Sequence, residues 1–143
     1  MASQGQMTGM LGVYLTAVEL VKRGFIVSPT SRSAIGADLL VTDQRCKKAW
    51  SVQVKTNAAV QNYWLVSPSG TTIRSPSHIY VHVNVSKNPQ RQPQFFVISS
   101  RVVADNVKMT HTRGPAFYRN EKYRDNWKLF GDPRGAVPAR KSA

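Results

Sequence analysis

The chain of 143 residues predicts an α/β (α+β) domain built on one central mixed β-sheet flanked by helices. Three observations support this fold class. Apolar residues near the N-terminus recur at helical spacing, short β-branched runs separated by turn residues fill the middle, and a second helical pattern follows them. We expect one domain over residues 8–130, after a flexible leader of residues 1–7 and before a disordered basic tail of residues 131–143.

The first element is a helix, for which Thr8 is the candidate N-cap. Its polar residues Thr16, Glu19 and Arg23 occupy the arc opposite its apolar positions, and Gly24 suits the position just beyond its last turn. The apolar positions are Met7, Met10, Leu11, Tyr14, Leu15, Val18 and Val21.

Six short segments are then predicted as strands. Two of them, residues 36–43 and 50–57, are joined by a short polar segment and are expected to form a hairpin. Residues 58–77 contain no clear helix, because two prolines and a glycine interrupt them, so a strand or an extended loop is expected there. Ser99 or Ser100 would cap a short final helix. The other four predicted strands are residues 25–28, 62–66, 78–85 and 94–98.

The predicted hairpin brings polar side chains together. Gln53 and Lys55 project from one face of its second strand, whereas Val52 and Val54 project from the other. If the turn is centred near residue 45 or 46, Asp38 lies opposite Gln53 or Lys55 and points to the same side. A carboxylate, an amide and an ammonium group are therefore expected to converge on one face of the sheet.

These residues carry a resemblance to a known superfamily. A strand with Gly36-x-Asp38, followed by a strand with Gln53-x-Lys55, resembles the core of the PD-(D/E)XK nucleases. Residues 9–25 are similar to the start of the small, Holliday-junction-resolvase-like members, in which a helix with Gly-x-x-Gly leads into Leu-x-x-x-Gly. The resemblance covers residues 9–60 best. It implies that residues 8–130 form a single nuclease-like domain with a restriction-endonuclease-like αβββαβ core.

The resemblance also implies roles for the polar residues. Asp38 would be a metal carboxylate, Gln53 would stand in place of the second carboxylate as a metal ligand, and Lys55 would help position or activate the attacking water. Mg²⁺ takes hard oxygen ligands and lowers the pKa of bound water. Because Gln53 offers an oxygen without a charge, Mg²⁺ is expected to be weakly held or absent. Related members often carry a Glu directly after the second glycine, where this chain has Val13.

The alternative for the same residues is structural. Asp38 would cap a loop, Gln53 would pair with backbone, and Lys55 would extend its charged end to water. His78 and His82 share one strand face, too far apart on an extended chain to chelate one ion, so they are expected to be ordinary surface or partly buried histidines.

The charge predicts DNA as a partner. Twenty Lys and Arg residues against seven Asp and Glu give a net charge of +13, which attracts polyanions. An acidic membrane surface, or a charge that serves only solubility, is the alternative. The aromatic and basic residues 117–130 either stack on bases or seal the core. The residues expected to contact phosphates are Arg32, Arg45, Lys47, Lys48, Lys87 and Arg91.

Two functions fit these features. The first is a divalent-metal-dependent DNA endonuclease that cleaves phosphodiester bonds with Asp38, Gln53 and Lys55. The alternative is a catalytically degenerate DNA-binding or assembly module of the same fold, and a small protein-interaction subunit is a third. The resemblance to resolvase-like nucleases raises the expectation of a homodimer. A lone Cys46, no secretory signal and no membrane-spanning run predict a cytoplasmic protein.

Overall fold

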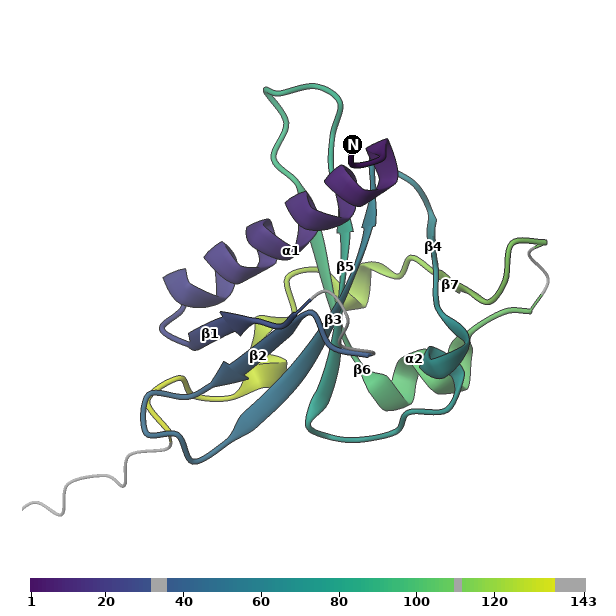
Figure 1. Ribbon diagram of the computed structural model, residues 1–143. Coiled ribbons are helices and arrows are strands. Elements are labelled where there is room, and N and C mark those ends of the chain that lie inside the picture. Colours follow the sequence, from purple (N-terminus) through teal and green to yellow (C-terminus); the bar gives the residue numbers. More distant parts are fainter. Residues whose placement is uncertain (32–35, 110–111, 136–143) are drawn as a thin grey trace, which may run out of the picture.

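The computed structural model describes residues 1–31, 36–109 and 112–135 of the chain (Figure 1). Its elements are α1 (Gln4–Lys22), β1 (Ile26–Pro29), β2 (Leu39–Thr42), β3 (Ala49–Asn57), β4 (Tyr63–Leu65), β5 (His78–Asn84), β6 (Gln94–Ser99), α2 (Ser100–Asn106) and β7 (Ala116–Tyr118). Five strands form one sheet in the order β1-β2-β3-β5-β6, in which only β3 and β5 pair in parallel. The prediction of one mixed central sheet is confirmed, with β4 and β7 as an added two-stranded sheet.

Helix α1 begins five residues earlier than the sequence predicted. Ser3 is its N-cap: the Ser3 hydroxyl accepts the backbone N–H of Gln6 at 3.2 Å, and the Gln6 side chain accepts the backbone N–H of Ser3 at 2.8 Å. Thr8 therefore lies in the second turn rather than at the cap. At the other end, Gly24 has a φ of 98°, as a residue just beyond a helix often does.

The side of α1 that packs on the sheet is its small-residue side. Gly12, Thr16 and Leu20 are buried, whereas most of the large apolar residues of the helix are exposed. A Cβ added to Gly12 would lie 1.8 Å from Oγ1 of Thr56 on β3, so only glycine permits this approach. Thr16, which the sequence placed on the arc opposite the apolar positions, is thus on the buried face.

The connection from β3 to β5 contains β4 and a 3₁₀ turn, η1 (Pro68–Thr71), as expected for a segment without a clear helix. Strand β7, which the sequence did not predict, pairs with β4. Three aromatic residues of 117–130 are buried and seal the core, namely Phe117, Trp127 and Phe130, whereas Tyr118 is exposed. Of the predicted tail, residues 131–135 pack on the turn after β2, where the Pro133 carbonyl accepts the N–H of Gln44 at 2.8 Å. Residues 136–143 lie outside the described residues.

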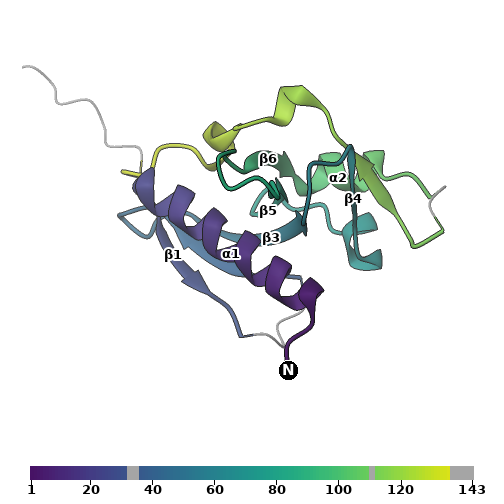
Figure 2. The ribbon, with the colours of Figure 1, turned by 90° about the horizontal axis from the view of Figure 1, so that it is seen from above.

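The sheet has a separate apolar cluster on each face. Seen from above, α1 lies over the β1 and β3 side, and β4 and α2 lie on the far side of β5 (Figure 2). The cluster beneath α1 consists of Leu20, Phe25, Leu39, Val41, Trp50, Val52, Val54, Ile79, Val81, Val83, Phe95, Val97, Trp127 and Phe130. The cluster on the other face consists of Trp64, Val66, Tyr80, Phe96, Ile98, Val103 and Phe117. Neither helix in the described part of the chain is both long and apolar enough to cross a membrane.

Candidate functional site

Asp38 lies one residue before β2, at the open end of the β2–β3 hairpin, where the start of β2 lies beside the middle of β3. We call this place the β2–β3 junction. The backbone N–H of Asp38 donates to the carbonyl of Val52 at 2.7 Å. One carboxylate oxygen, Oδ2, accepts the backbone N–H of Val54 at 2.8 Å and the side-chain amide of Gln53 at 3.0 Å. Because β2 begins only at Leu39, the carboxylate supplies Val54 with the acceptor that a longer β2 would have provided. Asp38 is therefore fixed in place by β3, with Gln53 beside it.

Lys55 follows Gln53 on the same face of β3 and is partly buried. Burial lowers the pKa of Lys55 below its ordinary value, and the negative charge of Asp38 opposes this shift. The ammonium group is thus within electrostatic reach of the carboxylate, in surroundings that disfavour its charge. A lysine with a lowered pKa exchanges its proton more readily near neutral pH than a free lysine does.

His82 pairs with Lys55 across β3 and β5, and it is fully buried. Its ring centroid lies 5.0 Å from that of Trp64 and 5.4 Å from that of Phe117, and neither ring nitrogen has a hydrogen-bond partner among the described residues. Burial, and then the charge of Lys55, lowers the pKa of His82 to about 3. His78 is also buried, with Nδ1 2.6 Å from the Ser51 hydroxyl. The expectation of surface or partly buried histidines is therefore wrong, because β4 and β7 cover this face.

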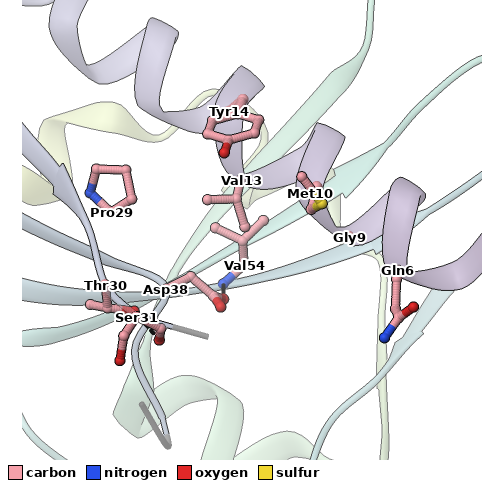
Figure 3. Close-up of a pocket in the computed structure, with 10 residues that line it drawn as sticks. All are labelled: Gln6, Gly9, Met10, Val13, Tyr14, Pro29, Thr30, Ser31, Asp38 and Val54. Atoms are coloured by element: carbon pink, nitrogen blue, oxygen red, sulfur yellow. Dashed lines mark hydrogen bonds between the residues drawn. The ribbon is translucent and has the colours of Figure 1, made fainter. Parts of the chain in front are cut away.

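A cavity of about 370 Å³ opens on the α1 side of the same junction (Figure 3). Asp38 and Val54 form its floor and Val13 of α1 faces it, so Val13 and Asp38 border the same cavity. Gln53 and Lys55 do not line this cavity, because they project from the opposite face of β3. The cavity is lined by Gln6, Gly9, Met10, Val13, Tyr14, Pro29, Thr30, Ser31, Asp38 and Val54.

Two oxygen atoms at this junction are of the kind that magnesium takes as ligands. Oδ1 of Asp38 accepts no hydrogen bond from the described residues, and Oε1 of Gln53 remains after its amide nitrogen has donated to Asp38. One carboxylate and one amide oxygen suit Mg²⁺, which commonly keeps several of its waters. Within residues 1–31, 36–109 and 112–135, no three His, Cys, Asp or Glu side chains are grouped to hold a metal.

Three of the predicted phosphate-binding residues, Arg45, Lys47 and Lys48, are exposed on the turn between β2 and β3. Asp43 holds this turn: its carboxylate accepts the backbone N–H groups of all three, at 2.8, 3.1 and 2.8 Å. Burial raises the pKa of Asp43, but these amides lower it more, so that the net shift is below the ordinary value. At about 3.3 Å per residue, the turn lies roughly 17 Å along β2 from Asp38.

The other basic residues lie at the opposite end of the sheet. Lys87 and Arg91 are exposed in the loop between β5 and β6, and β5 runs parallel to β3, so this loop follows the end of β3 that carries Lys55 (Figure 1). Five of the six predicted phosphate-binding residues belong to the described part of the chain. None of these five forms an ion pair with another described residue, whereas several other arginines do. Arg32 lies outside the described residues.

No protein-family model matches this chain, and no curated protein matches it. Its structure is similar to that of the bacterial homing endonuclease I-Ssp6803I, with a TM-score of 0.64 and 15% identity, over 89% of this chain and 93% of that one. The chain has a restriction-endonuclease-like fold. Hjc of Archaeoglobus fulgidus, a Holliday junction resolvase, aligns over 78% of this chain and 84% of its own, with a TM-score of 0.47 and 15% identity.

Two parts of the site were not found by reading the nuclease motif alone. Val13 departs from the nuclease pattern, and helical spacing alone does not place it at the cavity that Asp38 borders. The sequence also does not show that His82 is the cross-strand neighbour of Lys55, although the alternation of residues 78–85 puts His78 and His82 on one face. The signal was the register of β3 against β5, which a single sequence does not give.

Proposed function

We propose that this chain is a divalent-metal-dependent DNA endonuclease that cleaves phosphodiester bonds with Asp38, Gln53 and Lys55. The observation that carries the proposal is the contact between the Asp38 carboxylate and Gln53, with Lys55 in electrostatic reach, at the β2–β3 junction of a nuclease fold. A purely structural role explains why Asp38 accepts the backbone N–H of Val54. It does not explain why the charged Lys55 is partly buried beside Asp38.

Each residue has a defined task in this proposal. Asp38 and Gln53 are the residues that would hold Mg²⁺, while Oδ2 of Asp38 keeps the carboxylate anchored to β3. When bound, the ion would polarise the phosphate and lower the pKa of a bound water. Lys55 donates hydrogen bonds to the phosphoryl oxygens on which charge develops, and its lowered pKa allows it to take part in proton transfer.

The basic residues support the choice of DNA. Lys87 and Arg91 hold the duplex near the site, and Arg45, Lys47 and Lys48 contact it roughly 17 Å away. Phosphate contacts release counterions, so binding weakens as salt rises. Lys87→Ala with Arg91→Ala is expected to lower the slope of log K against log salt by about 2. Arg101→Ala, which removes an exposed arginine already close to Asp105, is the control and is expected to leave the slope unchanged.

Cleavage is tested by incubating linear, nicked and branched DNA with the protein in Mg²⁺ or Mn²⁺. We expect cutting by the wild type and a loss of at least about 100-fold in Asp38→Ala and in Lys55→Met. Asp105→Asn, which removes an exposed carboxylate on α2, is the matched control and should cut normally. Equal cutting by the Asp38→Ala variant contradicts the proposal. Salt-sensitive DNA binding without cutting in either metal would instead identify a catalytically degenerate DNA-binding or assembly module.

Two further expectations belong to the same proposal. A duplex has two strands to cut, and a homodimer would bring one site to each of them. We also propose that the protein works in the cytoplasm, where a lone exposed Cys46 stays reduced.

A further inference from the structure

Helix α1 presents a continuous apolar stripe on the side that faces away from the sheet. Its five residues are each between 44% and 57% exposed, and we call them the outer face of α1. Their spacing alternates between four and three residues, which is the a/d repeat of a coiled-coil seam. No described element crosses this side of the helix in Figure 1 or Figure 2. The outer face consists of Met7, Leu11, Tyr14, Val18 and Val21.

The outer face differs from the rest of the molecule in charge. All 20 Lys and Arg residues follow residue 21, and Glu19 is the only charged side chain before Lys22. Glu19 lies off the outer face and is already paired with Lys22 and Arg23. In a chain of net charge +13, the outer face of α1 is therefore an apolar surface without basic side chains, which we also call the strip.

This charge pattern decides what covers the strip. DNA and anionic membranes both need cations at the contact, which the first 21 residues lack. An acidic protein surface would likewise find no basic side chain to pair with there. A second copy carries the same neutral strip, and two chains of +13 repel each other least where neither presents lysine or arginine.

We propose that two copies of this chain pair through the outer face of α1, with the two helices antiparallel and Tyr14 near the twofold axis. A parallel pair would bring Lys22 and Arg23 of one copy against the same residues of the other, and it would align the two helix dipoles unfavourably. The antiparallel pair separates these charges and sets Met7 opposite Val21 of the partner subunit. The strip is only about 21 Å long, so we expect a dissociation constant in the roughly micromolar range.

Sedimentation velocity without DNA or metal tests the pairing, and so does not depend on nuclease activity. The wild type is expected to convert from monomer to dimer between about 1 and 300 μM, and to do so at lower concentration in higher salt, which screens the repulsion. Leu11→Glu with Val18→Glu should raise the dissociation constant at least about 100-fold. Because both positions are exposed in the single chain, circular dichroism and thermal melting should be unchanged at concentrations where the wild type is also monomeric. Val60→Glu, equally exposed but outside α1, is the matched control.

Cysteine cross-linking in a Cys46→Ser background tests the orientation. A mixture of Met7→Cys and Val21→Cys chains should form disulfide-linked dimers, whereas Met7→Cys alone should not, since the two copies of position 7 would lie roughly 21 Å apart. A wild type that stays monomeric throughout, or a Val60→Glu variant as weakened as the outer-face variant, overturns the proposal. Efficient self-linking of Met7→Cys overturns the antiparallel arrangement.

Discussion

Val13→Glu places a second carboxylate at the cavity that Asp38 borders, and it is expected to strengthen metal binding. Val13 faces this cavity from α1 while Asp38 forms part of its floor. Among the residues that line the cavity, only Asp38 offers a divalent ion a negative charge. A glutamate at position 13 doubles the negative charge available to the ion.

The size of the effect follows from Coulomb's law. Two carboxylates about 5 Å apart, at an effective dielectric constant of about 20, repel by about 3 kcal/mol in the absence of metal. A doubly charged ion attracts the new carboxylate about twice as strongly at the same separation, which leaves a surplus of about 3 kcal/mol before the ion loses water. Dehydration reduces this surplus, so a tenfold gain in affinity, or about 1.4 kcal/mol, is the smallest change we expect.

Isothermal titration with Mn²⁺, together with thermal melting, measures this change. Val13→Gln has nearly the same shape as Val13→Glu and no charge, so it separates the electrostatic effect from any loss of packing. We expect Val13→Glu to melt below Val13→Gln without metal and to recover with Mn²⁺, while Val13→Gln responds as the wild type does. Identical metal responses in the two variants would refute the placement of position 13 beside Asp38.

Two further predictions concern stability. Gly12→Ala should cost about 1–3 kcal/mol, because its Cβ would meet Oγ1 of Thr56 at 1.8 Å, whereas Gly9→Ala should gain up to about 1 kcal/mol, because nothing lies within 4 Å. Equal shifts in urea denaturation would contradict this difference. The folded chain keeps His82 neutral while the unfolded chain takes up a proton, so stability should fall by roughly 4 kcal/mol as the pH drops from 6.5 toward 3. His82→Phe should flatten that decline, and an unaltered pH profile would disprove the assignment.

The hairpin and its polar residues were predictable because they depend on local rules. Alternation put Gln53 and Lys55 on one face of a strand, and the short polar turn limited the register to two choices. The structure selects Gln53 as the neighbour of Asp38, because Asp43 ties the turn so that Thr42 pairs with Ala49.

The orientation of α1 was not predictable in the same way. Periodicity identifies an apolar stripe but does not say whether the sheet or a partner covers it. Here the close approach of Thr56 on β3 requires Gly12 and places Thr16 on the buried side, so the more apolar stripe faces outward. The three-residue β7 was missed because so short a segment carries no period, and its pairing with β4 bridges distant parts of the chain.

The central claim, that Asp38 binds a divalent metal at the β2–β3 junction, is tested most directly by titrating Mn²⁺ while following backbone amide resonances. The N–H of Val54 donates to Asp38, and the N–H of Arg45 donates to Asp43, a carboxylate at the far end of the same hairpin. We predict that paramagnetic broadening reaches Val54 at low Mn²⁺ and spares Arg45, and that Asp38→Asn abolishes it. Broadening at Arg45 first, or at neither amide, would contradict the claim.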